Sequence, residues 1–360
     1  MKLHADIAPA PRRVPASRGS LVLVAGSGRS GTSLFTGILQ RLGYLVPQPE
    51  VPADETNPRG FGESQWVVDF HTRLLRSAGI QISDARPAAS GLAAQVTLDE
   101  RVADELRAWL AGQLAHADAI VVKDPRLSWF LPLWRTCAQD IGTDPRCVTM
   151  LRHPGAVVDS KQRYYGASHG DVARAAGWVH QTLFTERATR DLPRAFVPYE
   201  DLLDDWTRIV ARAGEALDLA AVRDAPAASL RAAHEFVDRG LSRSRVGWGD
   251  ATLPDALRAL ADEVWTLVSQ LARSGGAGDD GALRALDAAR AAYLALYGEA
   301  EAIVQSSITA ARTRPARAPA PAPAPAPVLW LARRVPTRYR HVVPLEWRVR
   351  IARSLRHAIS

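Results

Sequence analysis

The sequence predicts an α/β fold in which a parallel sheet is covered by helices, followed by a helical C-terminal part. Two observations lead to this prediction. Short apolar runs, typical of buried strands, alternate along the chain with longer segments whose apolar residues recur at helical spacing. In addition, the first apolar run passes through a glycine-rich turn directly into a helical segment, which is a common strand-to-helix connection in such folds.

Four apolar runs predict the strands, at residues 20–25, 119–123, 147–151 and 195–198. Runs of this kind are typical of parallel strands that are buried on both faces. Helical spacing predicts the helices, which we place through Leu34–Leu42, Trp66–Leu74, 99–116, Trp129–Trp134, 155–165, 171–190 and from Tyr199 onward to about residue 310. Near the end of this part, Leu257, Leu260, Val264, Leu267, Val268 and Leu271 form one amphipathic stripe. Loops are predicted for 46–64, 80–97 and 164–172, and we expect these loops to line a ligand pocket.

The composition fits a soluble globular protein and excludes several other classes. Of the 360 residues, 47% are hydrophobic and 23% are charged, which is ordinary for such proteins. Cys137 and Cys147 are too few for a disulfide scaffold and lack the spacing of a zinc site, so we expect reduced thiols in a cytoplasmic protein. No run approaches the ~20 apolar residues of a membrane span. Residues 1–17 lack the apolar core of a signal peptide and are predicted to be a loose lead-in.

The positive charge of the chain is concentrated at its end. Residues 311–360 carry eleven arginines and one acid, whereas residues 1–310 sum to −3. Residues 311–327 contain a Pro/Ala repeat that predicts an extended linker between a domain at 18–310 and a basic tail at 328–360. The tail has an amphipathic helical pattern, which suits peripheral contact with an anionic membrane surface. A cover for a partner subunit, nonspecific nucleic-acid binding and a merely solubilising tail are the alternatives. Deletion of 318–360 is expected to leave ligand binding by the domain at 18–310 intact.

The turn GSGRSGTS at 26–33 is the strongest functional signal in the sequence. Glycines at 26, 28 and 31 leave consecutive backbone N–H groups unobstructed at the start of a helix, which forms a cradle for an anion. On the nucleotide loop G-x-x-x-x-G-K-[ST], the first and last of these glycines and Ser33 match. Thr32, however, stands where an ATPase or GTPase needs its lysine, and Arg29 places a cation inside the loop instead. The turn therefore predicts a three-layer P-loop domain, of the nucleotide-kinase-like type, that binds a phosphate other than a typical nucleoside triphosphate.

GRSGTS at 28–33 resembles the 5′-phosphosulfate loop of the bacterial sulfotransferases that use 3′-phosphoadenosine 5′-phosphosulfate (PAPS). The resemblance implies that the donor is bound by Gly28, Arg29, Ser30, Gly31, Thr32 and Ser33. A second block, LRHPGAVVDS, resembles the family's 3′-phosphate block and supplies Arg152 and Ser160. Independently of the family, an arginine at a strand end can hold a phosphate bidentately, and a serine near the next helix start adds a donor. Without the first block, Arg152 would be better explained by a structural ion pair.

Further blocks resemble the same family. KDPRLSWFLPLW implies that Lys123 lies beside the transferring group, and VPYEDLLDDW implies that Tyr199 lies near the adenine. FVDRGLSRSRVGW resembles the later phosphate-contact region and suggests Arg243 and Arg245 as donor ligands. Taken alone, Lys123 could equally be a lysine at the end of a strand, and the YED segment an ordinary acidic helix start.

Sulfuryl transfer to a hydroxyl needs charge stabilisation and a base. We assign the charge to Arg29 and Lys123, without a metal. NPRGFGES resembles a bacterial segment that carries a catalytic glutamate, which makes Glu63 our choice of base, although a helix-terminal acid is the simpler alternative. Asp124 and Glu55 are the reserves. His71 and His153 are expected to be structural.

The resemblance implies a PAPS-dependent sulfotransferase whose acceptor is a hydroxyl-bearing small molecule, a glycan or a glycolipid. Nucleic acid is the less favoured partner, and the oligomeric state is open between a monomer and a homodimer. A P-loop kinase or NTPase is the first alternative, which Thr32 in the lysine position disfavours. A non-catalytic nucleotide-binding membrane adaptor is the second.

Overall fold

A computed structural model describes residues 19–313, apart from 56, 166–169, 239 and 241–246. The chain divides into one compact unit that ends at Ala300 and a second that begins at Glu301. The described part of the second unit, 301–313, is helical for all but one of its residues. The predicted basic tail and the predicted lead-in lie outside the described residues, as does most of the predicted linker, and the domain boundaries proposed from the sequence stay predictions.

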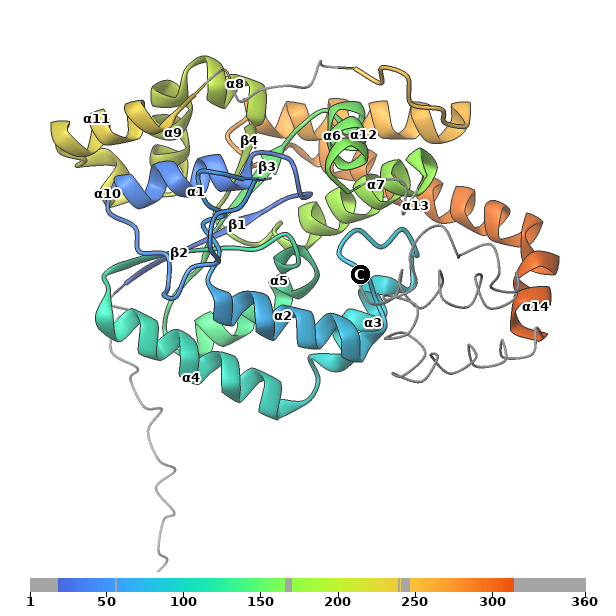
Figure 1. Cartoon of the computed structure of the whole chain (residues 1–360), viewed down its shortest axis with the longest axis horizontal. Helices are drawn as coiled ribbons and strands as arrows, with labels where there is room; N and C mark the ends of the chain where they lie inside the picture. Colours follow the sequence, from blue (N-terminus) through green and yellow to red (C-terminus); the bar gives the residue numbers. More distant parts are fainter. Residues whose placement is uncertain (1–18, 56, 166–169, 239, 241–246, 314–360) are drawn as a thin grey trace, which may run out of the picture. The chain divides into compact units, whose positions relative to one another are not determined.

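The first unit is an α/β structure with a four-stranded, all-parallel sheet, which confirms the predicted fold class (Figure 1). The strands are β1 (Ser20–Ala25), β2 (Ala119–Lys123), β3 (Arg146–Leu151) and β4 (Arg194–Pro198). Their order in the sheet is β2-β1-β3-β4. Each strand was predicted to within one residue, because short apolar runs buried on both faces are read easily from the sequence.

The strand order places the start of the functional site. From β1 the chain crosses to β2 on one side, and β3 then lies on the other side of β1. Such a reversal is the topological switch point of an open α/β sheet, and ligands bind in the crevice at the carboxyl ends of the strands there. The segments that follow β1 and β3 meet at this point, and they are the two segments singled out as anion sites in the sequence.

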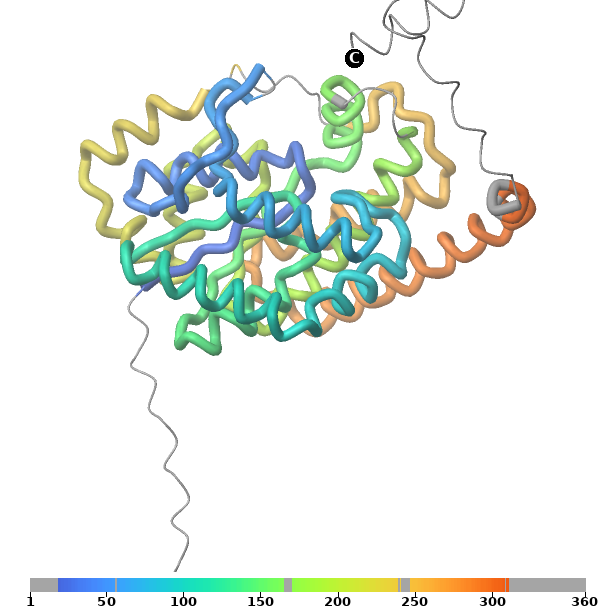
Figure 2. The backbone as a smooth tube through the Cα atoms, turned by 60° about the horizontal axis from the view of Figure 1, so that its bottom comes forward, coloured from blue at the N-terminus to red at the C-terminus, as the bar shows by residue number. Residues whose placement is uncertain are grey.

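Helices cover both faces of the sheet (Figures 1 and 2). In the first unit they are α1 (Thr32–Arg41), α2 (Gln65–Ala78), α3 (Ala89–Val96), α4 (Glu100–His116), α5 (Leu127–Asp140), α6 (Pro154–Tyr165), α7 (Asp171–Ala188), α8 (Tyr199–Asp204), α9 (Trp206–Ala216), α10 (Ala220–Arg223), α11 (Ala227–Phe236) and α12 (Asp255–Arg273), together with most of α13 (Asp280–Ile303). The last helix described, α14 (Gln305–Thr313), belongs to the second unit.

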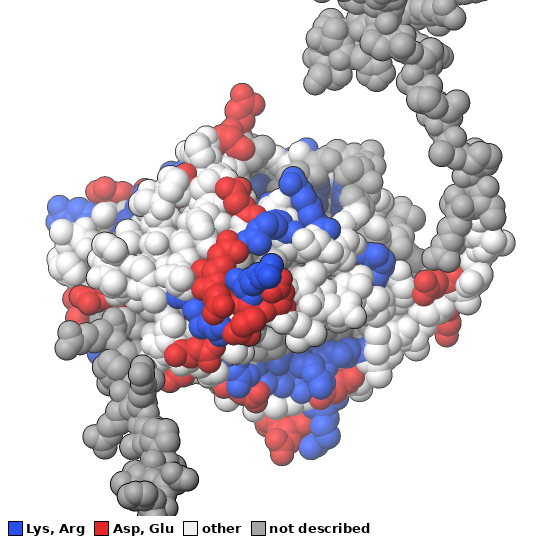
Figure 3. Space-filling view, turned by 90° about the horizontal axis from the view of Figure 1, so that it is seen from below, with Lys and Arg blue, Asp and Glu red and all other residues white. Residues whose placement is uncertain are grey.

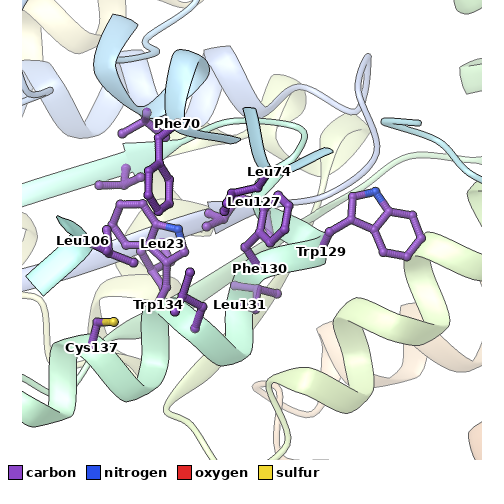
Figure 4. Packing of buried hydrophobic residues seen from close by; sticks show 14 of the residues in the cluster. Leu23, Phe70, Leu74, Leu106, Leu127, Trp129, Phe130, Leu131, Trp134 and Cys137 are labelled. Carbon is purple, nitrogen blue, oxygen red and sulfur yellow. The ribbon is translucent and has the colours of Figure 1, made fainter. Parts of the chain in front are cut away.

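Side-chain alternation along β1 divides the core between the two faces. Leu21 and Leu23 pack with α2, α4 and α5, and the close-up of this side shows Leu23 among Phe70, Trp134 and other aromatic and aliphatic side chains (Figure 4). Val22 and Val24 pack against α1, α9 and α11 on the opposite face. The predicted amphipathic stripe on α12 is buried against α7, α13 and β4, with Leu267 only partly buried. The core thus covers the strands of the sheet on both faces.

One predicted loop is wrong in part. Residues 80–97 were expected to be a variable loop, but Ala89–Val96 forms α3 and packs on α2 and α5. Three alanines give this segment good helix propensity, and burial of Ala89 and Ala93 adds the packing that its short length needs. The prediction of loop relied on the Pro and Gly residues around it and overlooked this alanine pattern.

The surface of the described part of the chain mixes both signs of charge. Arg107 pairs with Glu100, Asp104 and Asp140, and acidic and basic side chains lie beside one another on the face shown in Figure 3. None of the described helices is both long and apolar enough to cross a bilayer.

Candidate functional site

A cavity of about 890 Å³ lies at the carboxyl ends of the strands. Segments that follow all four strands line it, as do residues 57–63 and 80–83. Its size is in the range of pockets that hold nucleotide-sized ligands. Nearly all of the described residues proposed from the sequence line this cavity, namely Gly28, Arg29, Gly31, Thr32, Ser33, Glu63, Lys123, Arg152, Ser160 and Tyr199. Ser30 is buried within the same loop.

The loop after β1 has the backbone of an anion cradle. Gly26 and Gly31 have positive φ values of 134° and 86°, and Arg29 between them also lies in the left-handed region at 75°. A Cβ at Gly31 would lie 2.3 Å from Tyr199 Cδ2, so only glycine fits this close approach. The left-handed arginine costs about 1–2 kcal/mol, a strain that is typical of ligand-binding loops. The loop is therefore shaped for a ligand rather than for local stability.

The second block meets the loop directly. Arg152, which directly follows β3, donates from Nη1 to the carbonyl oxygen of Arg29 at 2.8 Å. Arg29 in turn donates from Nε to Ser160 Oγ on α6 at 3.1 Å. Its guanidinium lies over the ring of Tyr164, 4.1 Å from the centroid. Two segments that are more than 120 residues apart thus form one continuous cationic wall.

Arg152 is fixed in place by an aromatic ring rather than by a carboxylate. Its guanidinium lies over the ring of Tyr199, 4.4 Å from the centroid. Among the described residues, the nearest carboxylate oxygen, Glu200 Oε1, is 3.9 Å from Nε, too far for a hydrogen bond. This observation goes against the structural ion pair that the sequence left open, because Arg152 is buried and a buried structural arginine is normally closely paired.

Two buried polar atoms of this wall lack hydrogen-bond partners among the described residues: Ser30 Oγ and Arg152 Nε. Buried polar groups are nearly always paired, so unpaired ones in a pocket wall point to a ligand. Both atoms are donors or can act as donors, which suits phosphate oxygens. The residues present therefore fit a nucleotide with phosphates at both its 5′ and 3′ positions.

Lys123 and Glu63 form a buried ion pair on the other side of the loop. Lys123 is the last residue of β2, the strand next to the one that precedes the loop. Its Nζ donates to Glu63 Oε1 at 2.5 Å and to Ser33 Oγ at 3.2 Å. The two side chains are 3% and 10% exposed. Burial raises the pKa of Glu63 above its usual value, while the charge of Lys123 opposes this and Asp124 adds to it. A carboxylate whose pKa moves toward neutrality is better suited to act as a base.

Asp124 is occupied by a structural network and is unsuited to be the base. Its carboxylate accepts from His71 Nδ1 at 3.1 Å and from Arg126 Nη1 at 2.9 Å, and it is fully buried. Trp134 Nε1 donates to His71 Nε2 at 2.8 Å, so His71 carries its proton on Nδ1. Burial alone would raise the pKa of Asp124, but these partners hold it below its usual value. These contacts favour the predicted structural role of His71, whereas Glu55 lines the cavity and stays a reserve.

The structure adds cavity residues that the sequence did not single out. Asn57 Nδ2 donates to Ser33 Oγ at 3.2 Å. Lys161, next to Ser160 on α6, is buried on the cavity wall. Its position directly after the second block was the available signal, but a lysine on a helix is ordinarily exposed.

The remaining predictions fall elsewhere. Arg243 and Arg245 lie outside the described residues, and their roles stay predictions. His153 is packed edge-on against Trp248 and Trp265. Among the described residues no group of three or more His, Cys, Asp or Glu side chains is placed to hold a metal ion.

Comparisons with known proteins give structural matches only. No protein-family model and no curated protein matches the chain. The chain is similar to the sulfotransferase domain of the Synechococcus olefin synthase, with 19% identity and a TM-score of 0.40, over 71% of this chain and 96% of that domain. It is also similar to a sulfotransferase domain from the curacin biosynthetic pathway, with 12% identity and a TM-score of 0.38, over 70% and 98%. At these values the matches carry no argument about activity, which rests on the site itself.

Proposed function

We propose that the protein is a sulfotransferase that moves the sulfuryl group of PAPS to a hydroxyl acceptor. One observation carries the proposal: the loop after β1 and the Arg152–Ser160 segment share one wall, joined by the 2.8 Å and 3.1 Å contacts of Arg29. Two adjacent anion sites suit a nucleotide with phosphate on both sides of its ribose. A nucleoside triphosphate has no need of the second site.

The residues divide between the ends of such a donor. The backbone N–H groups of 28–33 with Ser30, Thr32 and Ser33 would hold the 5′ phosphosulfate, and Arg152 with Ser160 would hold the 3′-phosphate. Tyr199 would lie beside the adenine, and Arg243 and Arg245 stay proposed ligands. When bound, the donor supplies an activated sulfuryl group, and no metal is part of the proposal.

Glu63 is the proposed base. Its Oε1 would take the proton of the acceptor hydroxyl as that oxygen bonds to sulfur and the bond to the 5′-phosphate oxygen breaks. Lys123 and Arg29 would stabilise the negative charge that builds on the leaving oxygen. Lys123 also holds Glu63 in place at 2.5 Å, so one cation orients the base and faces the reacting group. The acceptor is proposed to be a hydroxyl-bearing small molecule, a glycan or a glycolipid, from the family resemblance.

Transfer of radiolabelled sulfate from PAPS to alcohols, sugars and alkyl glycosides tests this proposal. Replacement of a general base lowers turnover by about 10²–10⁴-fold, so Glu63→Gln is expected to lose transfer while its affinity for adenosine 3′,5′-bisphosphate stays within about threefold of the wild type. Glu55→Gln, which changes another carboxylate of the same cavity, is expected to keep transfer. Loss in Glu55→Gln alone would move the base to Glu55. Phosphorylation of acceptors from ATP–magnesium, without sulfate transfer, would overturn the proposal in favour of a kinase.

A further inference from the structure

Lys161 is a buried cation that the proposed donor site leaves unused. It is 7% exposed, and its Nζ donates to Ser27 Oγ at 3.1 Å and to Ser83 Oγ at 2.8 Å. Among the residues that the structure describes, no carboxylate forms a salt bridge with it. Buried charges in proteins are normally paired. An ammonium whose partners among the described residues are two hydroxyls on a cavity wall is therefore arranged to meet an anion from outside.

A second buried cation lies near Lys161. Arg174 on α7 is 6% exposed, lines the same cavity and forms an ion pair with Asp171 Oδ1 at 3.7 Å. Burial, with a smaller contribution from the charge of Arg174, lowers the pKa of Lys161 to about 8. Lys161, which pairs with no carboxylate among the described residues, therefore places a positive charge at this end of the cavity beside that of Arg174.

The backbone around Ser83, whose hydroxyl contacts Lys161, is held in place by hydrogen bonds from three helices. The carbonyl oxygens of 82, 84 and 85 accept from Trp129 Nε1 at 2.9 Å, His180 Nδ1 at 3.0 Å and Tyr293 OH at 2.5 Å. A Cβ at Gly177 would lie 2.4 Å from the carbonyl oxygen of Ser83, so glycine lets α7 approach this closely. These contacts fix the Ser83 hydroxyl that positions Lys161, which is what a preorganised binding group requires.

Apolar side chains line the cavity beside Ser83. Leu75 and Ile80 are buried there, and Ile82 is 37% exposed, which is unusual for a large apolar residue of a cavity wall. A ligand at the Lys161 end of the cavity therefore contacts a buried cation and an apolar surface together. The two phosphates of the proposed donor already have their own sites at the loop and at Arg152, so the ligand here is a different one.

We propose that Lys161 and Arg174 form a subsite for an acidic group of the acceptor, whose apolar part lies against Leu75, Ile80 and Ile82. The acceptor class is thus a hydroxyl-bearing amphiphile with a carboxylate, phosphate or sulfate ester, which includes acidic glycolipids. This inference rests on the proposed function, because it takes the ligand to be the acceptor.

Calorimetry with a matched ligand pair tests the subsite. The full-length protein is saturated with adenosine 3′,5′-bisphosphate and titrated with octyl β-D-glucuronide or octyl β-D-glucoside. The two ligands differ only at C6, where the glucuronide has a carboxylate and the glucoside a hydroxymethyl group. One charge-assisted hydrogen bond is worth about tenfold or more in affinity. We expect the glucuronide to bind at least about tenfold more tightly, and Lys161→Met to abolish that preference. Methyl β-D-glucuronide, without the alkyl chain, is expected to bind at least about tenfold more weakly than the octyl compound.

Controls separate this inference from the proposed function. Arg135→Gln removes a half-buried arginine of α5 that pairs with Asp191 at 3.3 Å, and it should keep the preference. Ser83→Ala leaves the lysine in place but removes its anchor, and it should reduce the preference if Lys161→Met does not fold. Failure of the bisphosphate itself to bind the wild type would count against the proposed function.

Four results would overturn the subsite. The first two are equal affinity of the wild type for the two glycosides and binding of neither glycoside. The third is a preference for the glucuronide that persists in Lys161→Met. The fourth is a loss of bisphosphate affinity in Lys161→Met as large as its loss of glucuronide affinity, which would place Lys161 in the donor site.

Discussion

Replacement of Lys161 by methionine should stabilise the protein at neutral pH, and the gain should fall as the pH rises. Methionine has a similar length, so the change removes the charge and keeps most of the packing. Burial lowers the pKa of Lys161 from 10.5 to about 8. Because the unfolded chain keeps the higher pKa, the folded state carries a cost that is complete below pH 8.

The pKa difference sets the size of this effect. A shift from 10.5 to about 8 corresponds to about 3 kcal/mol, at 1.36 kcal/mol for each pKa unit. Between pH 8 and 10.5 the unfolded chain binds the proton and the folded chain does not, so wild-type stability rises with pH over this window. The stability of the variant relative to the wild type should therefore fall by about 3 kcal/mol from pH 7 to pH 10.5.

Urea denaturation of both proteins at pH 7, 8, 9 and 10.5 measures this difference. All other titrating groups are common to the two proteins, so the difference isolates Lys161. A relative stability that stays constant across this range would refute the reasoning, as would a variant that is less stable than the wild type at pH 7. Such results would mean that Lys161 has a partner that compensates its charge, and the acceptor subsite would lose its main support.

Three further predictions concern the loop, the base and the buried network. Gly31→Ala should lower the melting temperature and the affinity for adenosine 3′,5′-bisphosphate, because its Cβ would lie 2.3 Å from Tyr199. Gly28→Ala, whose Cβ would have no contact closer than 3.8 Å, should melt within a few degrees of the wild type. Similar melting temperatures of the two variants would contradict this prediction. Sulfate transfer should decline as the pH falls through the raised pKa of Glu63, so its acidic limb should lie above the usual pKa of a glutamate; a pH–rate profile with its limb at or below that value would exclude Glu63 as the base. Asp124→Asn should destabilise the protein by about 3 kcal/mol in urea denaturation, since it leaves Arg126 and His71 without their carboxylate; a change below 1 kcal/mol would show that the network is dispensable.

Sequence reasoning found the parts of the site that are local in the chain. The strands were visible as apolar runs. The loop 26–33 was recognisable from its glycine spacing after a strand, and Arg152 from a block at a strand end that resembles a family segment. Parallel strands bring such ends to one edge of a sheet, so their meeting could be expected from the fold class. Lys123, the last residue of β2, could be expected at the same edge of the sheet for the same reason.

The roles of other residues depend on contacts that no local pattern encodes. Lys161 becomes notable only when Ser83, 78 residues away, is placed against it. That placement depends on the carbonyl contacts made by Trp129, His180 and Tyr293, which come from three separate helices. Likewise, the sequence did not show that His71 and Arg126 hydrogen-bond to the carboxylate of Asp124. Asp124 was therefore kept as a reserve base.

Calorimetric titration with adenosine 3′,5′-bisphosphate, with ATP–magnesium as the comparison, tests the central claim most directly. The proposed site predicts tight binding of the bisphosphate by the wild type and weak binding of ATP. Arg152→Ala should weaken bisphosphate binding by about 10- to 100-fold, the value of a charge-assisted hydrogen bond to phosphate. ATP–magnesium binding that is as tight as bisphosphate binding and unaffected by Arg152→Ala would contradict the claim, because Arg152 would then have a structural role and the loop would serve a kinase.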